Sequence, residues 1–335
     1  VVQTLMNAPD KLGNTAACLA AQRGDVTMLT KLIAAKAALD LANYHGDTPL
    51  TLAIDHNHTA AVKVLADAVV DDDGNTALCV AARDGHAYLL TKLIDAGGST
   101  TVQNKNGQNP LMLAATHSYA LCVQALAIGT TSLNATDTNY NTALMLMTAA
   151  GNLELATLLV TAKASLELKD RDGQTPLIIA AAHGHTDIAQ VLLNAGAQRD
   201  VRDNKAHTAL TLAAAAGHED TVKVLINARA TVNLCATADN ETALMAAAKQ
   251  GFTSVVQILL DAGAMHTMVN ARNHNALALA ASNGHADTVK CLVAAKAAVD
   301  SKHEHEATPL MLAAKEGHAD AIQQLANAGA QITLC

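Results

Sequence analysis

Histidine and glutamate alternate in the segment K-H-E-H-E at 302–306, and this is the feature of the sequence that comes nearest to a metal site. Both side chains are zinc ligands, and an extended strand would place His303 and His305 on the same side of the chain. His207 and His274 are expected on nearby turns. Zinc requires three or four ligands that converge at fixed distances, and nothing upstream completes such a set. The pattern therefore favours exposed turn residues over a metal site, and no cofactor is predicted.

Nucleophilic or redox chemistry has no recognisable motif in this chain. Glycine-rich phosphate loops, the H-E-x-x-H pair and the G-x-S-x-G elbow are absent. The cysteines are far apart and form no C-x-x-C pair: Cys18, Cys79, Cys122, Cys235, Cys291 and Cys335. They are predicted to be small buried residues of a protein in the cytoplasm or another reducing intracellular compartment. The sequence accordingly predicts no catalytic residue and no enzyme.

Composition limits the class of partner and the kind of core. The 335 residues carry a formal net charge of −8, with acidic and basic residues spread along the chain, so no nucleic-acid or anionic membrane surface is predicted. No apolar run approaches the roughly 18 residues of a membrane span. Half of the residues are hydrophobic, yet there are one Phe, four Tyr and no Trp. This favours thin, closely packed helices over a broad core filled by aromatic rings.

A pattern that recurs about every 33 residues organises the whole chain. Its anchor is a threonine or asparagine, usually followed by Pro-Leu or Ala-Leu. The anchors are Thr15, Thr48, Thr76, Asn109, Thr142, Thr175, Thr208, Thr242, Asn275 and Thr308. Successive anchors are 33 or 34 residues apart, except for one interval of 28. A leucine stands 17 residues after every anchor, and a glycine stands nine residues after eight of the ten.

Each unit predicts a tight turn followed by two helices, and the unit at 170–197 illustrates the pattern. Thr175 and Pro176 begin a short first helix, because proline is tolerated in the first turn, where its missing N–H costs nothing. Gly184 ends this helix. A second helix follows with one apolar stripe that includes Leu192. No unit can bury this stripe alone, so the units are expected to stack.

This unit resembles the ankyrin repeat, whose period and T-P-L signature it shares over essentially the whole chain. The resemblance implies an all-α repeat solenoid, an ankyrin-repeat array of helix-turn-helix units linked by β-hairpin loops. The chain lacks the family's usual histidine after T-P-L. The residues there are Cys18, Thr51, Cys79, Met112, Met145, Ile178, Thr211, Met245, Ala278 and Met311. In the family that histidine ties adjacent units by hydrogen bonding, so the links here are expected to depend more on van der Waals packing.

Another set of histidines follows the recurring glycine at the start of the second helix: His86, His185, His218, His285 and His318. Their recurrence indicates a packing feature of the family, and they are interpreted as structural.

The units are predicted to form one continuous array over 1–335, with ten repeats over 10–335 and a trailing half repeat at 1–9. Neither end carries a polar capping face, so the sequence is expected to be part of a longer ankyrin chain or to have both ends covered by a partner. Shortened hairpins near 9–12 and 69–73 are expected to leave notches in the row of hairpins. The three aspartates in the second are interpreted as a solvated turn.

The resemblance implies that a protein or extended peptide partner binds along a concave face made of hairpin tips and the exposed side of the first helix. Residues at these positions vary from unit to unit, whereas core positions barely change. The predicted contact residues are Tyr44, His45, Arg83, Asp84, Lys105, Thr116, His117, Tyr140, Arg171, His183, Lys205, His207, Lys249, Gln250, Arg272, His274, Glu304 and Glu306. Tyr140 with Arg171 is the predicted local anchor, because tyrosine and arginine are enriched at binding hot spots.

Two further classes of function stay open at this point. One is an architectural subunit of a large multiprotein assembly, held by its ends and its convex side. The other is a targeting array of a larger enzyme or channel whose remaining sequence lies outside these residues.

Overall fold

The structure is a computed structural model that describes residues 6–128, 133–236 and 239–331, apart from the side chain of Glu304. Within these residues the chain consists of α-helices joined by loops, which confirms the predicted all-α repeat fold. The chain divides into two compact units, Val1–Met147 with Thr161–Ala164 and Thr148–Val160 with Ser165–Cys335. The continuity of one array over 1–335 stays a prediction.

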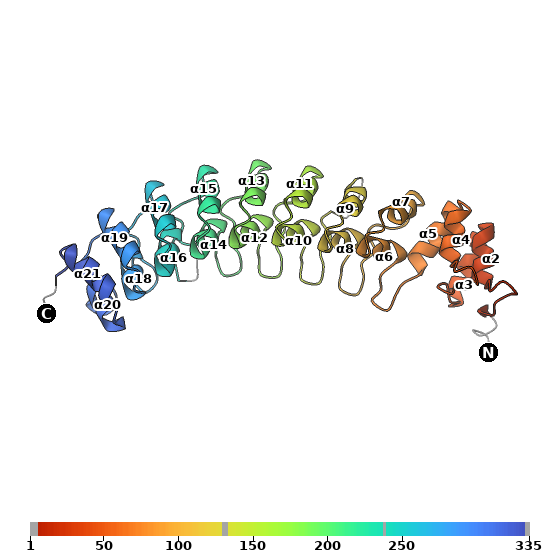
Figure 1. The fold of residues 1–335 in the computed structure, drawn as a ribbon, viewed down its shortest axis with the longest axis horizontal. Helices are drawn as coiled ribbons and strands as arrows, with labels where there is room; N and C mark the ends of the chain where they lie inside the picture. The colour runs from red at the N-terminus through yellow and green to blue at the C-terminus, as the bar shows by residue number, and fades with distance from the viewer. Residues whose placement is uncertain (1–5, 129–132, 237–238, 332–335) are drawn as a thin grey trace. The chain divides into compact units, whose positions relative to one another are not determined.

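In the described part of the first unit, four repeats contribute two helices each (Figure 1). The first helices of these repeats are α2 (Ala16–Arg23), α4 (Pro49–Asp55), α6 (Ala77–Arg83) and α8 (Pro110–Thr116). The second helices are α3 (Val26–Ala34), α5 (Thr59–Ala68), α7 (Ala87–Asp95) and α9 (Ala120–Ala127). The fifth repeat, α10 (Ala143–Ala149) and α11 (Leu153–Thr161), contains the division between the units.

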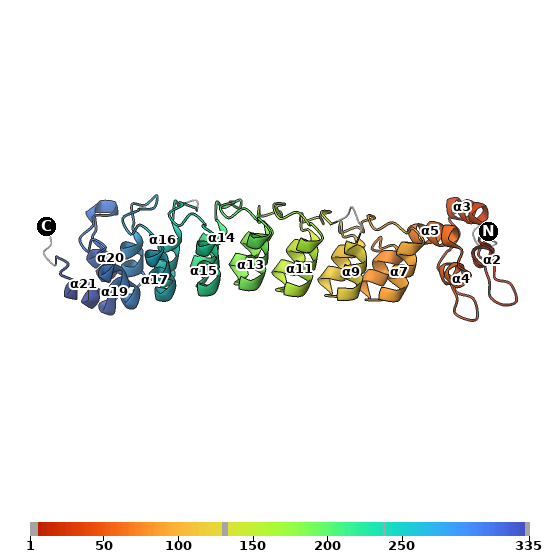
Figure 2. The same cartoon turned by 90° about the horizontal axis from the view of Figure 1, so that it is seen from above.

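The second unit continues with the same alternation. Its first helices are α12 (Pro176–His183), α14 (Ala209–Ala216), α16 (Ala243–Gln250), α18 (Ala276–Ser282) and α20 (Pro309–Glu316). Its second helices are α13 (Thr186–Asn194), α15 (Glu219–Asn227), α17 (Thr253–Asp261), α19 (Ala286–Ala294) and α21 (Ala319–Asn327). Each first helix packs against the next first helix, and each second helix packs against the next second helix (Figure 2). A short 3₁₀ turn, η1 (Glu304–Glu306), precedes α20.

Local capping explains where the first helices begin and end. The hydroxyl oxygen of Thr175 accepts the backbone N–H of Ile178, and Pro176 occupies the first turn of α12. Gly184 ends α12 in the left-handed region at φ +70° and donates its N–H to the carbonyls of Ala180 and Ala181. The other anchor residues cap their helices in the same way: Thr15, Thr48, Thr76, Asn109, Thr142, Thr208, Thr242, Asn275 and Thr308.

The apolar stripes predicted from the sequence form the core. Ile188 and Leu192 of α13 are at most 2% exposed, and Leu177 and Ala180 of α12 are at most 1% exposed. The small alanine side chains let neighbouring first helices within a unit lie close together, so the core of each unit consists of thin layers between successive repeats.

Apolar side chains fill most of the positions that lack the family's histidine. Met112, Met145, Ile178 and Met245 are at most 1% exposed. This confirms the expected packing at that position. At two of these positions a polar side chain makes a hydrogen bond to the loop that leads into the next repeat. The Cys18 thiol donates to the carbonyl of Leu41, and the Thr211 hydroxyl donates to the carbonyl of Ala236.

Histidines at the start of the second helices supply hydrogen bonds between repeats. The Nε2 atoms of His218, His285 and His318 lie 3.2, 3.0 and 3.1 Å from a backbone carbonyl oxygen that is 36 residues upstream. Each ring also covers the recurring glycine that follows the first helix of the preceding repeat, where a Cβ atom would lie 2.5–2.6 Å from the ring. The structural interpretation of these histidines is confirmed, and the links between repeats are less purely apolar than expected.

The two remaining histidines of this set differ from those three. His185 lies on Gly151 in the same way, at 2.7 Å from a Cβ atom built there. His86 is exposed, and its preceding repeat has Asn57 in place of the glycine.

The hairpin shortened near 69–73 alters the packing around it. Helix α5 is followed by Val69, whose backbone is extended, and the chain turns at once into the tip at 71–75. Helix α5 packs against α6 as well as α7. Among the described residues, a backbone hydrogen bond joins this tip to the next one, from Lys105 N to Asp73 O at 2.9 Å, and none joins it to the preceding tip at 43–47. The half repeat at 1–9 lies largely outside the described residues, so the notch near 9–12 stays a prediction.

Candidate partner-binding site

One acidic or amide side chain closes most hairpin tips. In the tip at 170–174, Asp170 Oδ1 accepts the backbone N–H of Asp172 at 2.9 Å and that of Gln174 at 2.8 Å. The same pair of hydrogen bonds is made by Asp10, Asn43, Asp71, Asn104, Asp137, Asp203 and Asn270. Such Asx turns replace the ladder of a regular β-hairpin, and they hold the tip backbone in one conformation without a partner.

The closing carboxylates are therefore used inside the tips. Hydrogen bonds from the Asn75 side-chain amide and from backbone N–H groups hold the pKa of Asp71 below its ordinary value. Asp203 is only 9% exposed. The side chains that the tips leave unused by this closure are those that follow the closing residue.

Several of the predicted contact residues project into solvent. Tyr44 is 76% exposed and Tyr140 is 58% exposed. Arg171, Lys205 and Arg272 are exposed, and within the described part of the chain no carboxylate lies within ion-pair distance of them. His45 and Gln250 are exposed as well. We call the predicted contact residues together the tip face.

Other members of the tip face already have charged partners. Arg83 Nε lies 2.9 Å from Asp84 Oδ1, and its Nη1 lies 3.4 Å from Asp71 Oδ2. Lys249 Nζ lies 3.2 Å from Glu241 Oε1. A ligand that binds these side chains has to compete with the existing ion pairs.

Lys105 and Glu306 are likewise engaged. Lys105 Nζ donates to the carbonyl of Asp72 at 2.6 Å, and Glu306 pairs with Lys302 at 2.7 Å. The ion pair between Lys302 and Glu306 is exposed, so it contributes little stability that a partner would have to overcome.

A third group of contact residues already interacts with nearby groups of the same or the next repeat. His207 Nδ1 lies 3.2 Å from Asp203 Oδ2, and the Thr116 hydroxyl donates to the carbonyl four residues upstream at 2.8 Å. His183 stacks on the ring of His185, with ring centroids 5.7 Å apart. His117 and His274 are held by ring contacts with Tyr119 and His303. Sequence reasoning placed these side chains on the tip face but had no signal for their internal partners.

Tyr140 and Arg171, the predicted local anchor, belong to different units. Tyr140 has a left-handed backbone at φ +63°, on the last tip of the first unit. Their use as a pair stays a prediction.

The segment 302–306 differs from its expected extended form. Its residues 304–306 form the turn η1, with His305 at φ +56°. His303 is only 4% exposed; its Nδ1 lies 2.7 Å from the carbonyl oxygen of Asn273, and its Nε2 lies 2.9 Å from Ser301 Oγ. The prediction that His303 and His305 share one side of a strand is wrong, because His303 takes the closing position of the tip and turns inward. The side chain of Glu304, another predicted contact, lies outside the described residues.

Clusters that resemble a metal site do not occur in the described ranges, since no three His, Cys, Asp or Glu side chains there are placed to hold an ion. Cys18, Cys79 and Cys122 are buried free thiols, and Cys235 and Cys291 are free and partly exposed. Burial raises the pKa of the Cys79 thiol. Cys335 lies outside the described residues.

A family model supports the repeat pattern independently of the geometry. The model, described as ankyrin repeats in three copies, matches residues 1–71, 66–137, 122–203, 195–270 and 264–334. The chain belongs to the ankyrin-repeat family. No curated protein matches the ankyrin chain. The ankyrin helices of the described ranges include none with the length and apolar character of a membrane span.

Ankyrin repeats are modules for protein–protein interaction, and the ordered tips of this array are consistent with that general role.

Protonation of His303 is expected to make the stability of the array depend on pH. Burial lowers its pKa below the ordinary value, while the hydrogen bond to the Asn273 carbonyl partly opposes this shift. The unfolded chain then binds the proton more readily than the folded one. The contribution of His303 to the free energy of unfolding is complete above the pKa of about 6.5 that histidine has in the unfolded chain. It is lost as the pH falls towards the lower pKa that His303 has in the folded protein.

We expect His303→Asn, which installs the closing residue of the tip at 270–274, to remove this dependence. Urea unfolding between neutral and mildly acidic pH measures it. The wild-type free energy of unfolding should fall more steeply than that of the variant, by at most about 1.4 kcal/mol per pH unit. Parallel pH profiles for the two proteins would contradict the prediction.

Proposed function

We propose that this ankyrin array is a non-catalytic scaffold that binds an extended peptide or a protein segment along the tip face. The observation that carries the proposal is that the tip backbones are closed by their own Asp and Asn side chains, while the residues between differ from tip to tip. A surface that is ordered before binding loses little conformational entropy on association. The free thiols suit a cytoplasmic or other reducing compartment.

The second unit favours an acidic partner segment. Its tips carry Arg171, Lys205 and Arg272 as exposed cations. The first two tips are joined directly, because the backbone N–H of Asn204 donates to Asp172 O at 2.9 Å. Two cations on adjoining rigid tips can bind successive carboxylates of one extended chain.

A peptide selection tests the proposal, because a random library contains acidic and non-acidic segments alike and requires no chosen partner. Peptides selected on the wild-type protein are measured against Arg171→Glu combined with Lys205→Glu. The matched control reverses two exposed charges on and after α19, Lys290→Glu with Lys296→Glu.

We expect the selected peptides to be rich in aspartate and glutamate and to lose about tenfold or more in affinity for the tip variant, corresponding to at least about 1.4 kcal/mol. The control should bind like the wild type. If the tip variant binds the selected peptides as tightly as the wild type does, the tip face is not the binding surface.

A further inference from the structure

The loop after each second helix has a recurring position that is most often aliphatic, and one repeat carries an arginine there. The residue 24 positions after the anchor is Leu39, Leu133, Leu166, Val232 or Val299 in five described repeats, each buried or half-buried. Two other repeats have the half-buried residues Thr100 and His266, and the repeat with the shortened hairpin has the exposed Asp72. In the repeat that begins at Thr175 this residue is Arg199, which is exposed. The side chain that is aliphatic in five repeats is therefore replaced here by a charged, exposed one.

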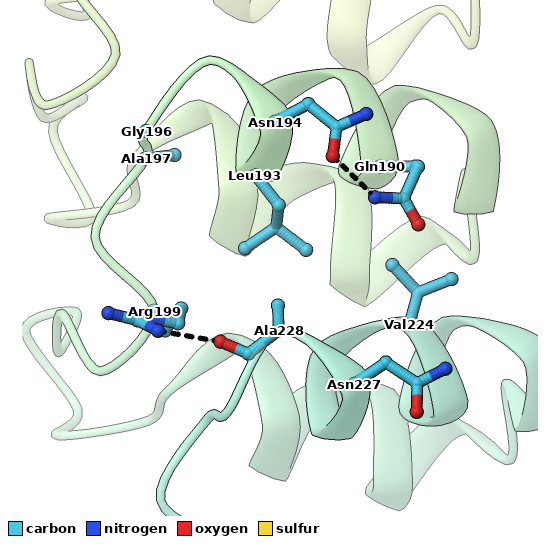
Figure 3. Close-up of a pocket in the computed structure, with 9 residues that line it drawn as sticks. All are labelled: Gln190, Leu193, Asn194, Gly196, Ala197, Arg199, Val224, Asn227 and Ala228. Atoms are coloured by element: carbon cyan, nitrogen blue, oxygen red, sulfur yellow. Dashed lines mark hydrogen bonds between the residues drawn. The ribbon is translucent and has the colours of Figure 1, made fainter.

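A cavity of about 380 Å³ lies between α13 and α15 in the second unit, and Arg199 is among the residues that line it. Its apolar part is formed by Leu193, Val224 and Ala228, and Arg199 lies at its edge (Figure 3). The amide groups of Gln190 and Asn194 line it too and are joined by a hydrogen bond of 2.8 Å. The cavity thus combines a small apolar surface with a guanidinium group.

The guanidinium of Arg199 is held in place but has no anionic partner in the described chain. Its Nη1 donates to the carbonyl of Ala228 at 2.6 Å, which leaves its other N–H groups for a ligand (Figure 3). The neighbouring carboxylate of Asp200 is used by Thr231, whose N–H and hydroxyl lie 3.0 and 2.6 Å from it.

Charges around the cavity favour an anion. Arg229, directly after Ala228, adds a second exposed cation at this end of α15. Asp220 lies in the first turn of α15 and pairs with Lys223 at 2.8 Å. A rise of 1.5 Å per residue places Asp220 about 12 Å along the helix from Ala228. Arg199 thus lines the cavity, the exposed Arg229 directly follows its lining residue Ala228, and the neighbouring carboxylate of Asp200 is already hydrogen-bonded.

We propose that this cavity binds a glutamate side chain presented by a protein partner. The carboxylate would pair with the free edge of the Arg199 guanidinium, which favours planar two-point contacts with carboxylates. The methylene groups would lie on Leu193 and Val224. The site is built from second helices, so it is separate from the tip face and does not depend on the proposed function.

Nuclear magnetic resonance of the isotope-labelled full chain tests the site with two blocked peptides, acetyl-Leu-Glu-Leu-amide and its glutamine analogue. We expect saturable shifts at the amides of Leu193, Val224 and Ala228 with the glutamate peptide. Binding of the glutamine peptide should be about tenfold weaker or undetectable, because the charge-assisted contact is lost.

Arg199→Val installs the residue type that Val232 and Val299 provide at this position in other repeats, and it should abolish these shifts while leaving the protein folded. The matched control Arg202→Val removes a nearby exposed arginine that does not line the cavity, and it should bind like the wild type. Equal binding of the two peptides, unchanged binding by Arg199→Val, or the absence of saturable shifts at millimolar peptide would each overturn the proposal.

Discussion

Replacing Leu192 with alanine is expected to lower the free energy of unfolding by about 2–5 kcal/mol. Leu192 is completely buried in α13, and α13 packs against α12 and α15. The substitution removes buried methyl groups and leaves a cavity between thin layers that contain few other large side chains. Because each repeat is stabilised mainly by its neighbours, the loss should also uncouple the repeats on the two sides of α13 within the second unit.

Leu325→Ala is the matched control for this experiment. Leu325 occupies the same position in α21 and is equally buried, but α21 is the last second helix of the described residues. We expect this change to loosen α20 and α21 while the main transition keeps its midpoint. Urea unfolding followed by circular dichroism, with hydrogen exchange to locate the affected helices, separates the two results. If both variants unfold in the same way, the neighbour-coupled description of the array is wrong.

Gly251→Ala should be more destabilising than an ordinary glycine substitution. Gly251 ends α16 at φ +79°, and an added Cβ would lie 2.5 Å from Nδ1 of His285. The ring has to move, which breaks the hydrogen bond of 3.0 Å from His285 Nε2 to the Lys249 carbonyl. The left-handed backbone costs roughly 1–2 kcal/mol for an alanine, and the displaced ring should add about 1–3 kcal/mol.

Gly317→Ala isolates the backbone part of this effect. Gly317 ends α20 with the same φ of +79°, but among the described residues nothing outside its own chain neighbours and helix lies within 4 Å of an added Cβ. Its cost should stay near the backbone value alone. Thermal and urea unfolding of the two variants measure the difference. Equal destabilisation would show that the contact of the His285 ring with the preceding repeat contributes little to the stacking of repeats.

The candidate binding surface was only partly predictable from the sequence. Exposed tip residues such as Tyr44, Arg171 and Lys205 follow from their place after the closing residue of a tip. The ion pair between Lys249 and Glu241 has no such signal, because it joins the end of a first helix to the hairpin before it. A pattern of residue types shows which positions are open to solvent, but it does not show which side chains meet there.

The sequence by itself determined the repeat, the limits of its helices and the stripe that each helix buries. These features depend on local interactions, such as the cap from Thr175 to Ile178 three residues later and the helical period that places Ile188 and Leu192 on one side. They can be recognised in any one unit of the sequence.

Only the tertiary structure decided which side chains remain available to a partner. His303 turns inward because an acceptor 30 residues upstream, the Asn273 carbonyl, lies beneath it. Arg199 borders an open cavity because the carbonyl of Ala228, 29 residues downstream, anchors its guanidinium. Such contacts join one repeat to the next, and their distances depend on how the repeats stack, which the pattern within a single repeat does not contain.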